Sequence, residues 1–122
     1  MKKIIKILLF LTFSLLINVG IVKANEKIKI GLLVPLTGKN SEIGESIIKS
    51  VRLAINKINN SSIEIIPKDT KSNPDTTLEA ARELASSEVK IIIGPVFNEN
   101  LVYLDRLGEI TFLALTNKNN NF

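Results

Sequence analysis

The stretch KIGLLVPLTGKNSEIGESIIKSVRLAINKIN, residues 29–59, decides the fold. The segment 27–35 begins with alternating apolar residues and becomes a continuous apolar run, which is typical of a strand buried on both faces. A polar turn containing Gly38 follows. Ser41 is expected to cap a helix whose apolar residues lie along one face as far as Ile58. A strand, a turn and an amphipathic helix in this order predict the first unit of an α/β fold.

The rest of the chain repeats this alternation. Asn73 and Pro74 provide a helix N-cap and a first-turn proline, and Gly108 is expected to end a third helix. In that third helix Leu101, Leu104 and Leu107 are expected to face inward. The further segments expected as strands are 62–68, 90–94 and 110–115, and those expected as helices are 74–88 and 98–107.

Composition and charge exclude several classes of function. The 122 residues contain no Cys and no His, which excludes disulfides, thiol nucleophiles and His or thiolate zinc sites. The formal net charge of +4 arises in the first 24 residues, which hold four basic and no acidic side chains. The remaining residues carry equal numbers of acids and bases. No basic surface is therefore expected for nucleic acid.

Residues 1–24 have the three parts of a secretory signal. Lys2, Lys3 and Lys6 precede an apolar run, and the sequence Val22-Lys23-Ala24 resembles a signal-peptidase site. An uncleaved membrane anchor and a buried helix are the alternatives. We expect a mature chain of residues 25–122 in the periplasm. Its only expected contact with the membrane is through the export signal.

A β-α-β-α-β-α-β pattern predicts a doubly wound parallel sheet of order 2-1-3-4 with helices on both faces. Ligands of such sheets bind beyond the carboxyl ends of the strands, where the winding direction changes. Here that place lies between the first and third strands. The residues expected to line a ligand site there are Leu36, Thr37, Gly38, Phe97, Asn98 and Thr116.

The motifs of catalysis and of nucleotide binding are incomplete. Gly38-Lys39 follows a strand, but Leu33 and Asn40 occupy positions where a phosphate-binding loop needs Gly and Ser or Thr. No nucleophile and base stand in a catalytic arrangement, and Asp69 suits a turn as well as it suits chemistry. We therefore expect a protein that is not an enzyme and has no catalytic residues, no cofactor and no metal.

The loop 94–100 offers a place for an anion. It leads from a strand end into the expected third helix, whose free N–H groups and dipole suit a carboxylate. Asn98 either donates to the ligand or caps the helix. Phe97 either lines the cleft or packs under the loop.

The quoted stretch, together with KIIIGPV at residues 90–96, resembles the type I periplasmic binding proteins, which include the leucine/isoleucine/valine receptors of ABC importers. The resemblance covers residues 28–117. Members of this family have two α/β lobes that close on a ligand, which implies that residues 25–122 are an incomplete first lobe. It also implies an amino acid or similar small solute and an ABC permease as partners.

The loops of this chain differ from those of the amino-acid receptors in the family. Amino-acid receptors place Ser or Thr after the third strand, where this chain has Val96-Phe97-Asn98, so Thr116 is the better candidate for a ligand contact. The segments GPVFNENLVYL and FLALTN are similar to loops of the penicillin-binding protein activators. That branch implies an envelope regulator that binds a peptidoglycan synthase instead of a solute. Both functions remain open at this point.

Overall fold

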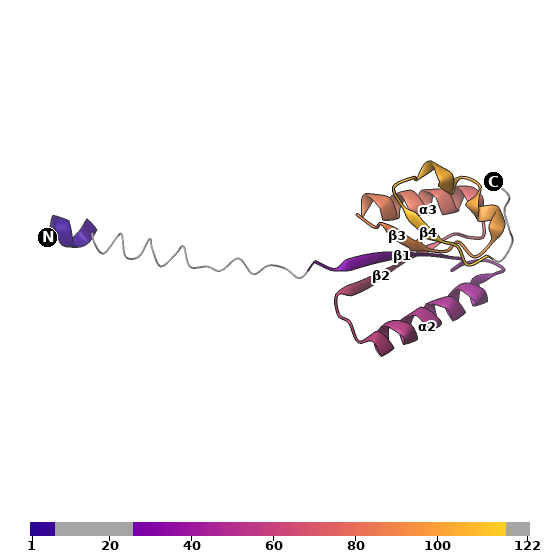
Figure 1. The fold of residues 1–122 in the computed structure, drawn as a ribbon, viewed down its shortest axis with the longest axis horizontal. Helices are drawn as coiled ribbons and strands as arrows, with labels where there is room; N and C mark the ends of the chain where they lie inside the picture. The colour runs from indigo at the N-terminus through magenta and orange to yellow at the C-terminus, as the bar shows by residue number, and fades with distance from the viewer. Residues whose placement is uncertain (7–25, 117–122) are drawn as a thin grey trace.

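The computed structural model describes residues 1–6 and 26–116 (Figure 1). Its four strands form one parallel sheet of order β2-β1-β3-β4, which confirms the predicted doubly wound α/β fold. The strands are β1 (Ile28–Val34), β2 (Ile63–Asp69), β3 (Ile91–Ile93) and β4 (Thr111–Leu113). The other elements are the α-helices α2 (Ser41–Ile58) and α3 (Pro74–Ser86) and the 3-10 helices η1 (Asn98–Leu101) and η2 (Leu104–Arg106).

The two faces of the sheet are covered unequally. Helix α2 lies on one face, and α3 with η1 and η2 lies on the other (Figure 1). The main core is on the α3 side. There Leu33 from β1 and Ile92 from β3 are fully buried against Leu84 of α3, and Leu104 of η2 closes the cluster. Burying side chains of this kind contributes about 1.5–3 kcal/mol each, so α3 and its face hold the domain together.

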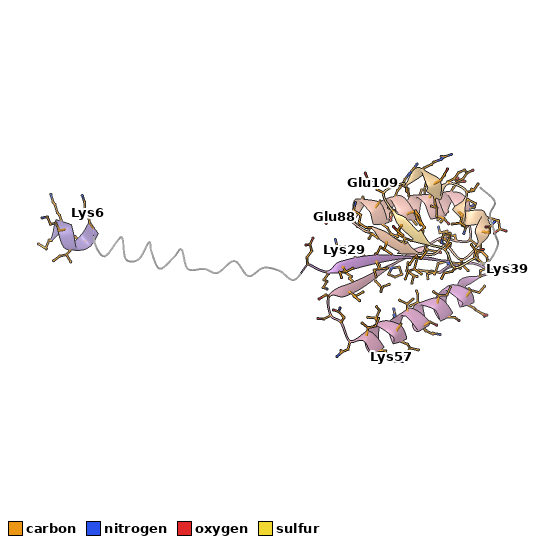
Figure 2. The ribbon with its side chains drawn as sticks, in the orientation of Figure 1. Lys6, Lys29, Lys39, Lys57, Glu88 and Glu109 are labelled. Carbon is orange, nitrogen blue, oxygen red and sulfur yellow. The ribbon has the colours of Figure 1, made fainter. Side chains whose placement is uncertain are left out.

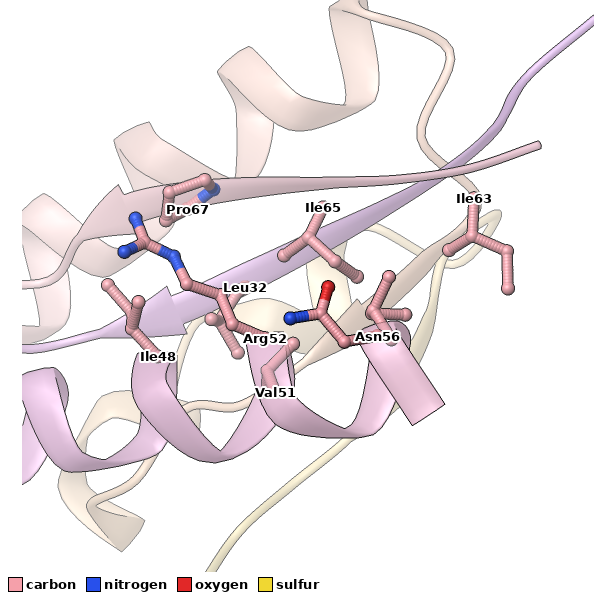
Figure 3. A pocket seen from close by; sticks show the side chains of 9 residues that line it. Leu32, Ile48, Val51, Arg52, Asn56, Ile63, Ile65 and Pro67 are labelled. Carbon is pink, nitrogen blue, oxygen red and sulfur yellow. The ribbon is translucent and has the colours of Figure 1, made fainter. Parts of the chain in front are cut away.

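Helix α2 touches the sheet mainly at its first turn. Gly44 is its one buried residue, and a Cβ there would lie 1.8 Å from the carbonyl oxygen of Pro35. Farther along, the helix diverges from β2 and leaves a groove of about 220 Å³ (Figure 3). The side chains that line the groove are mostly apolar and include Ile48, Val51, Ile63 and Ile65. The apolar face predicted for this helix is therefore only partly buried.

Two expectations about helix starts have different outcomes. Asn73 is the N-cap of α3, as predicted, because its Oδ1 accepts from the N–H of Thr76 at 3.0 Å. Ser41 does not cap α2 but is its first residue, and the N-cap is Asn40. The Asn40 side chain makes no cap hydrogen bond. It donates instead to the hydroxyl oxygen of Ser72, 3.0 Å away.

The predicted third α-helix is wrong. The segment 98–107 forms the two short 3-10 helices η1 and η2. Leu101, Leu104 and Leu107 recur at a strict interval of three, which matches the three residues per turn of a 3-10 helix and not the 3.6 of an α-helix. All three still pack on the core, Leu104 fully buried and the others partly. The direction of the leucines was predicted correctly, and the helix type was not.

The predicted export signal lies mostly outside the described residues. Residues 7–25 contain its apolar run and its expected cleavage site. Over the part of the chain that is described, no helix has both the length and the apolar character that crossing a membrane requires.

Candidate functional site

The loops that leave the carboxyl ends of β1, β3 and β4 define the candidate site. We call the loops 35–40, 94–98 and 114–116 the mouth. Since β1 pairs with β3 and β3 with β4, the three loops leave neighbouring strands at the same end of the sheet. Lys39 marks this end, and Lys29 and Glu88 lie toward the opposite one (Figure 2).

All six predicted site residues fall in the mouth. The exposed ones are Thr37 and Gly38, and the half-buried ones are Leu36, Phe97, Asn98 and Thr116. Gly38 has a φ of 83°, in the left-handed region that favours glycine, and its carbonyl accepts from the N–H of Ser41 at 3.2 Å. Gly38 is therefore the turn residue that directs the chain from β1 into α2.

Asp69, the last residue of β2, holds the first mouth loop in place. Its Oδ1 accepts from the backbone N–H of Leu36 and of Lys71, each at 2.8 Å. Its Oδ2 accepts from the hydroxyl of Thr37 at 2.6 Å. The carboxylate thus joins the end of β2 to the loop that follows β1. Of the two roles that the sequence left open for Asp69, the structure supports the turn.

These contacts also set the ionisation of Asp69. Partial burial acts to raise the pKa of its carboxyl group, but these three hydrogen bonds, from Thr37, Leu36 and Lys71, act against it, and so does the nearby backbone N–H of Thr37. The net effect is a pKa below the ordinary value. Asp69 is therefore a charged anchor at neutral pH.

The other two mouth loops are joined by backbone hydrogen bonds. The N–H of Gly94 donates to the carbonyl of Leu113 at 2.9 Å, and the N–H of Leu115 donates to the carbonyl of Pro95 at 3.0 Å. Gly94 has a φ of 110°, and a Cβ on it would lie 2.3 Å from the carbonyl oxygen of Leu33. A glycine is therefore required where the β3 loop crosses the end of β1.

The expected anion site at a helix N-terminus is not formed as predicted. Asn98 begins η1, which has four residues and no side-chain cap. The helix dipole needs a longer run of aligned peptides, so it supplies little attraction for a carboxylate here. Asn98 does not cap the segment, because the N-cap is Phe97. A ligand in the mouth would therefore be bound by individual backbone N–H groups and by side chains, and not by a helix dipole.

Sequence reasoning missed two residues near the mouth. The anchoring role of Asp69 follows from the strand order, which places the carboxyl end of β2 beside that of β1. Asn100 is 1% exposed, although asparagine is rarely buried. No sequence pattern indicated that burial. Within residues 1–6 and 26–116, no group of Asp, Glu, His or Cys is placed to hold a metal ion.

The comparisons with known proteins agree with this fold. An ABC transporter substrate-binding protein from Sphaerobacter thermophilus matches with a TM-score of 0.67 at 24% identity, over 73% of this chain and 26% of that one. A solute-binding protein of an ABC transporter from Rhodopseudomonas palustris, in complex with 3,4-dihydroxybenzoic acid, matches with a TM-score of 0.62 at 30% identity, over 70% and 24%.

A third similar structure is the C-domain of LpoA from Haemophilus influenzae, a regulator of PBP1A. It matches with a TM-score of 0.62 at 28% identity, over 75% of this chain and 29% of that one. This chain therefore spans about a quarter of the length of the solved structures that it resembles. No curated protein is significantly similar to it in sequence.

The sequence profile of one family covers most of the described chain. The match extends over residues 27–110, from the residue before β1 to the residue before β4, and the family is described as periplasmic binding protein. Its members and the solute-binding neighbours are binding proteins of type I architecture, with the same α/β sheet. The chain belongs to the periplasmic binding protein family.

Proposed function

We propose that this chain is the beginning of the first lobe of an extracytoplasmic solute-binding protein, which delivers an amino acid or a similar small solute to an ABC permease. The observation that carries the proposal is the mouth. Three loops gather at the point where the sheet changes its winding direction, which is where open α/β sheets bind ligands. The family match and the solute-binding neighbours support it.

The proposed solute carries a carboxylate. Backbone N–H groups of the loop 94–98, the side-chain amide of Asn98 and the hydroxyl of Thr116 are the groups proposed to receive it. Thr37 is less suited as a donor, because its hydroxyl donates to Asp69. A carboxylate is common to amino acids and to the dihydroxybenzoic acid in the Rhodopseudomonas palustris complex. A second lobe would supply the partner for an amino group.

Calorimetry tests this proposal. The longest form of the protein that its gene encodes is titrated with a panel of amino acids, short peptides and hydroxybenzoates. We expect saturable binding of at least one carboxylate solute. Asn98→Ala and Thr116→Ala should each weaken that binding about 10-fold or more, the loss expected for a hydrogen bond to a charged group.

Thr111→Ala is the matched control. Thr111 is exposed at the first residue of β4, away from the mouth, so its loss should leave the affinity unchanged. An equal loss of affinity in the Thr111→Ala variant would contradict the placement of the solute at the mouth.

The second candidate is an envelope regulator that acts through contact with a peptidoglycan synthase. Two observations favour it: the similarity to the LpoA C-domain, and Val96-Phe97-Asn98 in place of a hydroxyl residue after β3. The panel separates the two functions. A regulator should give no heat with any solute and should retain a peptidoglycan synthase in a pull-down from envelope extract.

Both functions place the protein outside the cytoplasm, and we propose that residues 1–24 export it to the periplasm. We predict that the exported protein begins at Asn25, because the small residues before it suit signal peptidase. N-terminal sequencing of the periplasmic fraction measures this directly. A soluble cytoplasmic product that keeps Met1 would contradict it.

A further inference from the structure

Asn100 is a buried amide whose hydrogen bonds are unaccounted for. It lies in η1, directly after the second mouth loop, and 1% of its surface is exposed. Within the described part of the chain, neither its side-chain nitrogen nor its oxygen has a hydrogen-bond partner. Oδ1 of Asn98 is also buried without a partner there. Three polar atoms of one 3-10 segment therefore face the interior unpaired.

The other buried polar side chains of the same domain are paired. Thr77 is 0% exposed, and its hydroxyl donates to the carbonyl of Asn73 at 2.7 Å. Thr70 is 1% exposed, and its Oγ1 accepts from the N–H of Ser72 at 3.3 Å. A carboxamide has two donors and two acceptor sites, and burying it unpaired is destabilising. Among the buried polar side chains of residues 26–116, Asn100 is thus the exception.

The burial of Asn100 limits what its partner can be. At 1% exposure, no solute of the size of an amino acid reaches the side chain. A water molecule is small enough and offers both donors and acceptors, and buried waters in globular proteins typically make about three hydrogen bonds to polar groups of this kind.

We propose that Asn98 and Asn100 form a binding site for internal water between η1 and the rest of the α3-side layer. Each side-chain N–H of Asn100 donates to a water molecule, and this internal water donates to the buried Oδ1 atoms of Asn98 and Asn100. The water site and the proposed solute site share Asn98: its Oδ1 is the atom that faces the water, and its side-chain N–H groups are those proposed for the solute. The water site rests on the burial of these unpaired atoms and not on the proposed function.

The water site would position the second mouth loop. The segment η1 is short and has no side-chain cap, and one backbone hydrogen bond, from the N–H of Asn100 to the carbonyl of Phe97 at 3.1 Å, closes its first turn. Such a turn is weak by itself. Water bound to Asn98 and Asn100 adds hydrogen bonds on the interior side, which fixes the positions of Phe97 and Asn98 within the mouth.

Nuclear magnetic resonance of the isotope-labelled, unmodified protein tests the proposal. The side-chain amide protons of Asn100 should show cross-relaxation with a water molecule that stays bound much longer than surface water. The side-chain amide of Asn73, which is exposed at the start of α3, is the internal control and should contact only fast-exchanging water. Cross-relaxation from Asn100 to protein protons alone would overturn the proposal. So would cross-relaxation to water whose residence time is as short as that of the water at Asn73.

A substitution gives a second, independent readout. Asn100→Leu keeps the branched shape of the side chain but removes every hydrogen bond. If water satisfies the amide, Tm should fall by about 4–8 °C or more. If the amide is unpaired, Leu relieves the cost, and an unchanged or raised Tm would overturn the proposal. Glu99→Leu, which places the same side chain at an exposed position of η1, should not lower Tm.

Discussion

Asp69 shows how one side chain connects two strand ends. Its two oxygens accept three hydrogen bonds, two from the loop after β1 and one from the turn that follows Asp69 itself. The sequence indicated a strand end at this position and left its role open. What decided the role was the pairing of Val34 with Asp69 across β1 and β2, a contact between residues far apart in the chain.

We predict that Asp69→Asn destabilises the protein at pH 7 by about 1–3 kcal/mol, because the amide cannot accept all three hydrogen bonds. The folded pKa of Asp69 lies below its unfolded value of about 3.9, so the carboxylate stabilises the fold above that pH. This stabilisation is lost as the pH falls through the folded pKa. Urea unfolding at pH 7 and at successively lower pH should show the difference between variant and wild type shrinking.

Glu79→Gln provides the control for this pH series. Glu79 is exposed on α3, and its substitution should change the stability little at any pH. A difference between wild type and Asp69→Asn that stays constant down to the lowest pH would show that the charge of Asp69 is not what anchors the loop.

The helices differ in how far local sequence determines them. The cap of α3 was predictable, because Asn73-Pro74 satisfies the first turn without help from distant residues. The segment with Leu101, Leu104 and Leu107 was predicted to face the core but not to form 3-10 turns, since short helices depend on what they pack against. The incomplete burial of the apolar face of α2 could not be predicted, because it depends on how closely the helix approaches β2.

We predict that Gly44→Ala separates the start of α2 from the end of β1. The new methyl group would lie 1.8 Å from the carbonyl oxygen of Pro35, which is backbone and cannot rotate away. The expected loss of stability is about 1–3 kcal/mol or more, in urea unfolding monitored by circular dichroism. Gly108→Ala is the matched control, since nothing lies within 4 Å of a Cβ there. Equal stability of the two variants would contradict the close packing.

As a whole, the described chain is a sheet with two edge strands, β2 and β4, and one half-covered face. Strand β4 pairs only with β3. Because Ile92 faces the α3-side core, its neighbours Ile91 and Ile93 face the α2 side, and so does Leu113, which pairs with Ile93. Ile91 is 39% exposed there and Leu113 is 53% exposed. Strand order and sheet class were predictable from alternation alone. Where the loops meet was not, because it depends on crossings such as that of Gly94 over Leu33.

We predict that the isolated chain is marginally stable and self-associates through β4, because open edge strands pair with other chains. Sedimentation velocity should show concentration-dependent association. Leu113→Lys should reduce that association, since a charge on an edge strand opposes pairing. Leu53→Lys, on α2 at a residue that is 70% exposed, should not. A wild-type chain that stays monomeric and melts cooperatively would contradict the prediction.

The most direct test of solute binding at the mouth is chemical-shift mapping. The isotope-labelled protein, in the longest form that its gene encodes, is titrated with the tightest-binding solute of the calorimetric panel. We predict shifts at the backbone amides of Gly38, Asn98 and Thr116, and none at Lys29 and Lys90 near the opposite end of the sheet. Shifts confined to that opposite end or to the groove under α2, or no shift with any solute, would contradict a solute-binding mouth.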